Sequence, residues 1–322
     1  MSSNLTPLCT FAVSPEKCYI IFINAIKTGY IKMKLFTEII NKKNEKLFGK
    51  NAVVTGIGSC FSQYVMEQLA SAGFDSAHNP NGIVYNSHSI VNSLERIINK
   101  SNYKKEDFLF HDNLWHSWEH HGSFSHQSQE TLKETIKKSA NNFYNKLVMS
   151  DIFMLTPSSS VVYCLKENNR LVANCHKYPG NKFHTVILSP EENYKNLKKA
   201  LELIRLVNTK CSIIITLSPV RHYPGDLVLN ARSKANLLYA IHKVVEESEN
   251  AAYFPSYEIL LDELRDYRFF NEDMLHPSEL ARKIIFDRFV DTFFDEKCKK
   301  EICESFKNNK KMQHRQLNAD YL

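Results

Sequence analysis

The sequence predicts an α/β protein with three layers (α/β/α), in which a mostly parallel, doubly wound sheet lies between two layers of helices. Short apolar runs are typical of buried strands, and segments with apolar residues at helical spacing follow them. The clearest runs are residues 51–57, 151–156 and 211–217. Because strand, helix and strand in this order favour right-handed crossovers between parallel strands, we expect helices on both faces of one sheet.

Each predicted element has its own signal in the chain. After the first strand, Phe61, Val65 and Leu69 share one helical face. Ser189-Pro190-Glu191-Glu192 is typical of a capped helix start with proline at the first helical position. A helix around residues 237–245, a last strand over 251–259 and a final helix over 277–294 complete the predicted order.

Two longer interruptions decorate the predicted domain. The first, residues 86–148, is rich in His and Trp, and the second, residues 158–188, contains two apolar runs that flank Glu167-Asn168-Asn169 like a hairpin. Both follow predicted strand ends, where ligands bind in doubly wound sheets. We expect a domain over residues 33–296, an N-terminal extension over 1–32 and a basic C-terminal tail over 297–322.

Composition and charge argue against several classes of protein. Of the 41 Lys and Arg residues, seven fall in residues 297–315, so most of the net charge of +6 lies in a tail that we expect to be solvated. The nearly neutral remainder does not favour nucleic-acid binding. The eight Cys show no regular spacing, which favours a reducing compartment, and the longest N-terminal apolar stretch is too short to span a membrane. We expect a cytoplasmic protein without a membrane anchor.

Two motifs carry residue types suited to acyl chemistry. Gly58-Ser59-Cys60-Phe61 ends the first strand and opens its helix, so Ser59 is either a nucleophile beside helical N–H groups or only a helix cap. Asp273-Met274-Leu275-His276-Pro277 precedes the last helix, with Pro277 expected at the first helical position. There Asp273 could orient His276 as a base, or both could be turn residues.

Together these motifs resemble the Ser-Gly-Asn-His (SGNH, GDSL-like) hydrolase superfamily, and Gly58-Ser59-Cys60-Phe61 resembles the signature of the GSCFA family. Further pieces resemble that family in order along the chain, from about residue 33 to 294. They are 79–86 (NPNGIVYN), 172–177 (VANCHK), 218–222 (SPVRH), 253–258 (YFPSYE) and 262–268 (DELRDYR). The resemblance implies an SGNH-type, flavodoxin-like fold. It also implies a hydrolase without a cofactor or a metal.

The same resemblance implies roles for individual residues. Ser59 would attack an ester carbonyl, His276 would take and return the proton, and Asp273 would orient His276. The oxyanion would be held by the backbone N–H groups of Ser59 and Gly82, with Asn86 or a group near residue 158 as a further donor. Where the family pattern leads us to expect a Leu-Gly-Thr-like turn, the chain has Pro157-Ser158-Ser159, which leaves one oxyanion donor open.

Three other features leave alternatives open. Cys60 is either a thiol nucleophile or a small core residue, and the superfamily pattern favours Ser59 over it. Residues 111–126 hold both Trp and five of the 13 His. This segment is a lid that offers aromatic surface to a ligand, a packing element, or a metal site at His116 and His120. Arg221-His222 either binds substrate or, through Arg221, pairs with an acidic residue.

Two functions therefore compete. The first is a serine esterase that cleaves an O-acyl ester of a small molecule or carbohydrate, with acyl transfer to an alcohol as a variant. Its predicted substrate-binding residues are Trp115, Trp118, His121, Arg221 and His222. The second is a non-catalytic or metal-dependent binding protein that uses the His-rich segment. The sequence leaves the natural substrate and the oligomeric state open.

Overall fold

The computed structural model of the 322-residue chain describes residues 37–40, 44–222 and 225–319. The chain divides into two compact units, Met1–Glu38 and Ile39–Leu322, and the second unit contains all of the helices and strands of the fold that the structure describes. The predicted extension over residues 1–32 lies outside the described residues.

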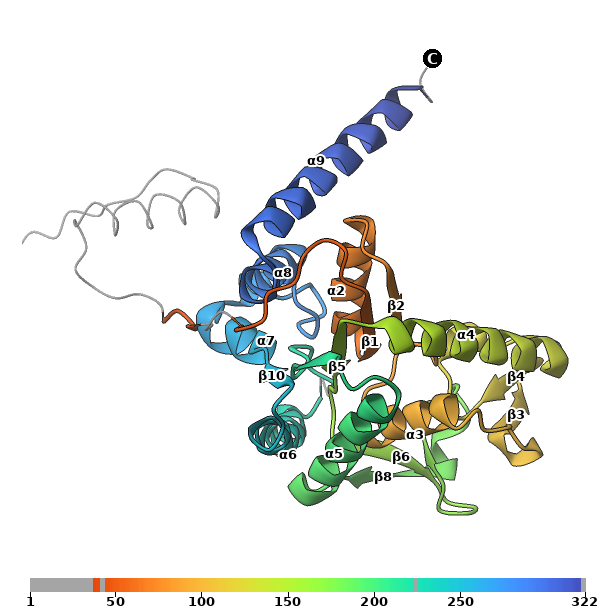
Figure 1. Ribbon diagram of the computed structural model, residues 1–322. Coiled ribbons are helices and arrows are strands. Elements are labelled where there is room, and N and C mark those ends of the chain that lie inside the picture. The colour runs from red at the N-terminus through yellow and green to blue at the C-terminus, as the bar shows by residue number, and fades with distance from the viewer. Residues whose placement is uncertain (1–36, 41–43, 223–224, 320–322) are drawn as a thin grey trace, which may run out of the picture. The chain divides into compact units, whose positions relative to one another are not determined.

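A five-stranded parallel sheet forms the centre of this unit (Figure 1). Its strands are β1 (Val54–Gly58), β2 (Ser76–His78), β5 (Ile152–Thr156), β9 (Ser212–Ile215) and β10 (Ala251–Tyr253). They lie in the order β10-β9-β5-β1-β2, and every neighbouring pair is parallel. The order is that of a doubly wound, flavodoxin-like sheet, whose switch point lies between β1 and β5. The predicted fold class is therefore confirmed.

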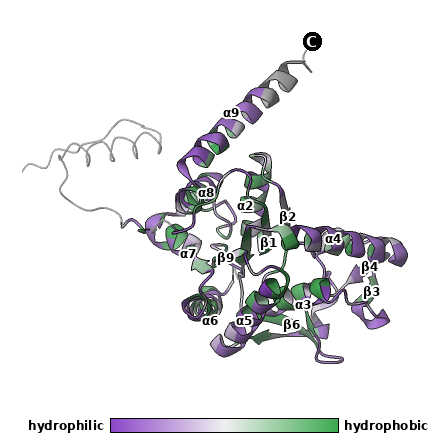
Figure 2. Cartoon of the chain, in the orientation of Figure 1, coloured by the Kyte–Doolittle hydropathy of each residue, from purple (hydrophilic) through white to green (hydrophobic). Residues whose placement is uncertain are grey.

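Helices cover both faces of the sheet. On one face lie α2 (Cys60–Ser71) and α8 (Glu279–Phe293), and the other carries α3 (Ser87–Ile98), α4 (Gln129–Met149), α5 (Pro190–Val207) and α6 (Leu227–Glu246). The two layers give two apolar clusters, one on each side of the sheet. Figure 2 shows the apolar residues concentrated on the strands, with hydrophilic residues prominent on α4 and α9.

The strands read as continuous apolar runs because both of their faces are buried. In β5, Ile152 and Met154 pack on the α2 and α8 side, and Phe153 and Leu155 pack on the side of α5 and α6. All four side chains are fully buried. This burial on two faces explains why the first, third and fourth strands of the sheet were visible in the sequence. The short, polar β2 gives no such signal, and it was missed.

The two insertions form small antiparallel sheets. The first contains β3 (Phe108–His111) paired with β4 (Leu114–Ser117), and the second contains β6 (Val161–Leu165) between β7 (Leu171–Val172) and β8 (Phe183–Ile187). The hairpin predicted around residues 167–169 is thus confirmed. The first interruption was predicted as an insertion, but part of it belongs to the core of the fold, because it contributes α3 and α4 to a helical layer.

Short elements complete the fold. The 3-10 helices are η1 (Lys105–Asp107), η2 (Gly122–Phe124), η3 (Gly180–Lys182) and η5 (Tyr267–Phe269). The strand predicted over residues 251–259 is too long, because the chain turns after Tyr253 into α7 (Ser256–Glu258) and the π-helical η4 (Ile259–Glu263). Pro255, which has no N–H to give to a neighbouring strand, precedes α7.

The basic C-terminal segment is helical, as α9 (Glu296–Ala319). Its first turns are not solvated as predicted, because Cys298 and Ile302 are buried in the cluster formed with α2 and α8. These two apolar residues stand one helical turn apart, and this spacing anchors the helix to the domain. Across the part of the chain that the structure describes, no helix is both long and apolar enough to cross a membrane.

Candidate functional site

Ser59, the predicted nucleophile, lies at the carboxyl edge of the sheet, where β1 and β5 end. Gly58, the last residue of β1, has φ of +148°, and a Cβ there would lie 2.2 Å from the carbonyl oxygen of Thr156 on β5. Only glycine fits this close approach between the two strand ends. The approach sets the start of α2 at the switch point of the sheet, where doubly wound proteins bind their ligands.

Ser59 is the N-cap residue of α2, but its side chain makes no capping hydrogen bond. The residue is 0% exposed, and its Oγ has no hydrogen-bond partner among the described residues. Its backbone N–H, a predicted oxyanion donor, instead donates to the carbonyl oxygen of Thr156 at 3.1 Å. No hydrogen bond therefore joins Ser59 to His276, and the predicted nucleophile faces the interior.

Asp273 and His276 form the pair that the sequence predicted. His276 Nδ1 lies 2.7 Å from Asp273 Oδ2, and Asp273 Oδ1 accepts the backbone N–H groups of His276 and Leu275. The hydrogen bonds from the backbone and ring of His276 lower the pKa of Asp273 to about 2. An ionised Asp273 favours the tautomer with the proton on Nδ1, which leaves Nε2 free to accept a proton.

The position of this pair relative to α8 differs from the expectation. Pro277 is not the first helical residue, because Ser278 is the N-cap and accepts the N–H of Ala281 at 3.3 Å. His276 therefore lies in the preceding loop, where its side chain is 45% exposed. It is too far from the first turn of α8 for the helix dipole to act on it as strongly as predicted.

Arg221 braces the loop that carries this pair. Its backbone N–H donates to Leu275 O at 3.1 Å, and its guanidinium donates to Met274 O at 3.4 Å. The guanidinium also lies over the ring of Phe270, 4.1 Å from the ring centroid. The predicted alternatives were a substrate group or a carboxylate, but its contacts in the structure are with the loop itself.

Beside this loop, three polar side chains form a buried hydrogen-bonded chain. Ser158 Oγ bonds to His222 Nε2, and Lys234 Nζ lies 3.4 Å from the same hydroxyl and 2.7 Å from Ser218 O. Burial, with the nearby charges of Lys234 and His276, lowers the pKa of His222 to about 3. His222 is therefore neutral, and the hydrogen bond from Arg221 N–H to Leu275 O joins its segment to the loop of Asp273 and His276.

The two other predicted oxyanion donors differ in whether their N–H groups are already hydrogen-bonded. The N–H of Gly82 donates to Asn79 O at 2.8 Å, so it is already bonded, and a Cβ on Gly82 would clash with His121. Asn86 is the N-cap of α3, and its Oδ1 accepts the N–H of Ser89. Its Nδ2 makes no hydrogen bond to the described residues, so Asn86 remains the predicted donor with an unused N–H.

A cavity of about 440 Å³ opens beside His222. Aromatic and amide side chains line it, together with serine and cysteine from the second insertion. The lining includes Tyr85, Asn86, Ser159, Tyr163, Asn174, Cys175, Tyr178, Phe183 and His222. Rings of this kind offer stacking surface, and amide groups fix the orientation of a polar ligand. The second insertion thus builds one wall of this cavity.

The predicted lid over residues 111–126 packs against the protein and does not line this cavity. Trp118 is 6% exposed and packs on Phe183 and Val172, behind the cavity wall. Trp115 packs on Phe110 at 5.2 Å between ring centroids. His121 caps η2 by accepting the N–H of Ser123. All three residues contact other protein groups in the structure, so their role in substrate binding stays a prediction.

The histidines of the same segment are bonded to protein groups. Both ring nitrogens of His116 are occupied, one by Ser125 Oγ and the other by His111 O. His120 bonds to Ser117 Oγ, and burial lowers its pKa to about 3. The metal alternative required both histidines on one helix face, but His116 lies in β4 and His120 in the turn after it. Within the described ranges, no group of three metal-ligating side chains is placed to hold an ion.

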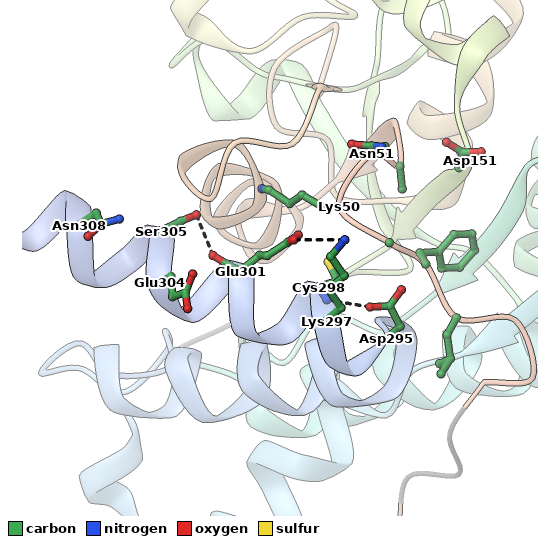
Figure 3. A pocket seen from close by; sticks show the side chains of 14 residues that line it. Lys50, Asn51, Asp151, Asp295, Lys297, Cys298, Glu301, Glu304, Ser305 and Asn308 are labelled. Carbon is green, nitrogen blue, oxygen red and sulfur yellow. Dashed lines mark hydrogen bonds and ion pairs between the residues drawn. The ribbon is translucent and has the colours of Figure 1, made fainter.

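A larger hollow, of about 740 Å³, lies at the opposite edge of the sheet, between α9 and the segment before β1 (Figure 3). Asn51 and Asp151, which precede β1 and β5, form part of its wall. On α9, Glu301 lies 4.0 Å from Lys297, and Asp295 accepts the N–H of Cys298. Because ligands of doubly wound sheets bind at the carboxyl edge, we do not place the functional site here.

Sequence reasoning missed Tyr85 and Lys234, and it named the neighbourhood of Ser158 only as the place of a further oxyanion donor. For Lys234 a signal was present, since it lies three and seven residues before Leu237 and Ile241, on the apolar face of α6. A lysine on such a face must be buried with partners or be functional. Tyr85 contacts His222 edge to face at 4.9 Å, a contact between distant segments that spacing along the chain does not reveal.

Comparison with known proteins gives a family but no close relative. Similar solved structures include a family 3 carbohydrate esterase from Talaromyces cellulolyticus, 9% identical, which covers 74% of this chain and 94% of its own, with a TM-score of 0.37. A family 3 carbohydrate esterase from Clostridium thermocellum is 13% identical, with coverages of 74% and 93% and a TM-score of 0.32. A mutant acetyl esterase with acetate ion is 10% identical, with coverages of 73% and 92% and a TM-score of 0.37.

Similarity at this level does not assign an activity to the chain. No match was found among curated proteins. The model of the GSCFA family, in contrast, matches residues 53–289, which run from the strand before the Gly58 turn to the end of α8. This match includes most of the chain, together with the sheet, the Asp273 and His276 pair and the cavity wall. The chain belongs to the GSCFA family.

Proposed function

We propose that the protein hydrolyses an O-acyl ester at the carboxyl edge of its sheet. The observation that carries this proposal is the 2.7 Å hydrogen bond between Asp273 and His276 Nδ1, in the loop before α8. A histidine held by an ionised carboxylate through Nδ1 is the base arrangement of Ser-His-Asp hydrolases. Its free Nε2 takes the proton of a nucleophile and returns it to the leaving alcohol.

The nucleophile comes from the start of α2. Ser59 is the nucleophile that the sequence predicts, and Cys60 is the next side chain along the helix. Either one would form a covalent acyl intermediate, which water then hydrolyses. Helical N–H groups at this end of α2 favour negative charge on the attacking atom. Asn86, with its unused Nδ2, is the side chain that we propose as oxyanion donor.

The cavity beside His222 supports a polar, ring-shaped alcohol as the leaving group. Tyr163 and Tyr178 present aromatic surface, and Asn86 and Asn174 present amide groups. Sugar rings combine an apolar face with hydroxyl groups, so an acylated carbohydrate suits such a wall. We therefore propose an O-acylated sugar as the substrate class.

A panel of acetylated sugars and short-chain aryl esters tests the proposal. The wild-type protein should hydrolyse at least one of them, and His276→Ala should lower kcat/KM by about 10³-fold, as expected for loss of a general base. His184→Ala, which removes an exposed histidine from β8, is the matched control and should stay within about two-fold. Equal hydrolysis by wild type and His276→Ala would remove the proposed base and, with it, the proposed function.

A further inference from the structure

The cavity beside His222 differs from other hollows of the molecule in the charge of its wall. Among the residues that the structure describes, its lining contains no Asp, Glu, Lys or Arg. The hollow between α9 and the segment before β1 includes Lys50 and Asp151, and another, of about 660 Å³, includes Arg96 and Glu119. An ionised ligand in the cavity beside His222 would lose hydration without gaining an ion pair from the wall.

Four titratable groups of this wall are uncharged at neutral pH. Burial raises the pKa of Tyr85 and that of Tyr163. It raises the pKa of the Cys175 thiol to about 11 and lowers the pKa of His222 to about 3. These side chains therefore offer hydrogen bonds and apolar surface to a ligand, but no compensating charge.

Three contacts fix the position of His222 in the wall. Its backbone N–H donates to Asn230 Oδ1 at 3.1 Å, and the ring of Tyr85 meets it edge to face, with 4.9 Å between the centroids. Ring atom Nε2 bonds to the hydroxyl of the fully buried Ser158. Nδ1 has no hydrogen-bond partner among the described residues, so it is the ring nitrogen that remains for a ligand.

Lys234 determines which ring nitrogen of His222 carries the proton. Lys234 is 2% exposed and lies on α6, one turn after Asn230. An ammonium group can only donate, and this one donates to Ser218 O at 2.7 Å and to Ser158 Oγ at 3.4 Å. Within the described residues, the Ser158 hydroxyl has His222 Nε2 as its one acceptor. A neutral imidazole that accepts at Nε2 carries its proton on Nδ1.

We propose that the cavity binds an uncharged sugar ring, and that His222 is a specificity-determining residue that donates a hydrogen bond from Nδ1 to an oxygen of this ring. Lys234 is a positioning residue, which acts on His222 through Ser158. The inference rests on the proposed function, because it specifies the alcohol part of the ester. A neutral sugar should fit the site, and a uronic acid or an amino sugar should not.

Titration calorimetry with matched methyl glycosides tests the selection by charge. The neutral probes are the methyl glycosides of glucose, galactose and mannose, and each is compared with its uronic acid and its 2-amino derivative. At least one neutral glycoside should bind, and its charged partners should bind about ten-fold or more weakly, because the wall compensates neither charge. A charged partner that bound as tightly, or no binding by the three neutral glycosides, would overturn the inference.

This measurement needs no turnover, so it separates the inference from the proposed function. If the protein hydrolysed esters but bound neutral and charged glycosides equally, the inference would fail and the proposed hydrolysis would stand. If it selected the neutral glycosides but hydrolysed no ester, the proposed hydrolysis would fail and the selectivity of the cavity would stand.

Proton–nitrogen correlation spectra of the histidine rings test the roles of His222 and Lys234 in the full chain. The His222 signals, assigned by their loss in His222→Phe, should show a protonated Nδ1 that shifts when a neutral glycoside binds. In Lys234→Met the Ser158 hydroxyl can turn, so the form protonated on Nε2 should gain population. The matched control Lys243→Met, on the same helix, should leave the spectrum of His222 unchanged.

Two results would contradict these roles. A wild-type His222 protonated on Nε2 would overturn the proposed donor, and this spectrum is decisive even if Lys234→Met does not fold. An unchanged His222 spectrum in a folded Lys234→Met variant would overturn the positioning role of Lys234.

Discussion

The carboxyl edge of the sheet and the His-rich segment over residues 111–126 hold similar residue types, but they use them in opposite ways. In the His-rich segment, His116 is bonded at both ring nitrogens, and His120 is buried and neutral beside Ser117. At the carboxyl edge, one N–H of Lys234 and Nε2 of His276 have no hydrogen-bond partner among the residues that the structure describes. The groups available for chemistry are therefore those whose donors or acceptors are not occupied by other protein groups. The number of histidines in a segment does not identify them.

Ion pairs show the same contrast. Arg170 bridges Asp107 and Glu119 at 2.7 and 2.6 Å beneath the His-rich segment, and Arg96 pairs with the same Asp107. Every charge in this group is compensated by another one. Such a cluster stabilises a loop, because removal of one partner leaves a buried charge uncompensated.

The largest effect that we expect is on catalysis, from a single carboxylate. Asp273→Asn should lower kcat/KM by about 10³-fold to 10⁴-fold, because the amide no longer holds the proton on Nδ1 of His276. The matched control is Glu272→Gln, a change of the neighbouring exposed carboxylate, which should stay within about two-fold. Steady-state kinetics on the best ester of the panel measure both. Similar losses in the two variants would mean that activity depends on the negative charge of this loop. It would then not depend on the hydrogen bond between Asp273 and His276.

The next largest effect is on the free energy of unfolding, and the same substitution at two glycines tests it. Gly58→Ala should lower the free energy of unfolding by about 3 to 4 kcal/mol, since its Cβ would meet Thr156 O and its backbone has a positive φ. Gly122→Ala, in the His-rich segment, meets nothing within 4 Å and should change it by less than about 0.5 kcal/mol. Urea unfolding followed by circular dichroism compares them. Equal midpoints would contradict the close approach of β1 and β5.

Acid should weaken the fold through two buried histidines, one in the His-rich segment and one in the second insertion. Burial lowers the pKa of His120 to about 3 and that of His176 to about 4. A histidine with a lowered folded pKa takes up a proton on unfolding, so its stability contribution is complete above about pH 6.5 and declines toward pH 4. Each residue should account for a loss of about 2 kcal/mol between pH 7 and pH 5.

The variant His120→Gln checks this prediction, because glutamine does not titrate. Unfolding free energies measured from pH 7 to pH 5 should show a smaller slope in the variant, by up to about 1.4 kcal/mol per pH unit. The matched change His126→Gln, at an exposed position in the same segment, should leave the slope unchanged. The same slope in His120→Gln and wild type would contradict the burial of a neutral His120.

The smallest effect concerns the brace on the catalytic loop. Arg221→Ala should lower kcat/KM by about five-fold, since it removes one hydrogen bond to Met274 O and the contact with the ring of Phe270. Arg232→Ala, on the exposed face of α6, is the matched control and should have no effect. If Arg221 contacted substrate directly, KM would rise by a larger factor while kcat stayed unchanged.

The elements that the sequence revealed are those whose burial imposes a period on the chain. Residues 151–156 form an unbroken apolar run because β5 is buried on both faces, and the capping box at Ser189 marks the start of α5 within one residue. Helix α8 begins at Glu279, two residues after the predicted first residue Pro277, because Ser278 caps it by accepting the N–H of Ala281.

The site was predictable where its residues are close in sequence. Asp273 and His276 stand three residues apart, so their hydrogen bond follows from the loop itself. The groups contributed by tertiary packing were not visible. Lys234 reaches Ser158 from α6, and Ser59 is fully buried while the adjacent Cys60 is partly exposed. Burial of that kind depends on the packed structure and not on the local pattern.

The position of a trapped acyl group is the sharpest check on whether acyl chemistry occurs at the carboxyl edge. Brief exposure to an aryl acetate, acid quench and tryptic digestion should place the acetyl group in the peptide over residues 51–96, which contains the start of α2. The same peptide should carry no acetyl group when His276→Ala is treated in the same way. An acetyl group found instead within residues 105–126, or one unaffected by His276→Ala, would contradict acyl transfer at the start of α2 with His276 as its base.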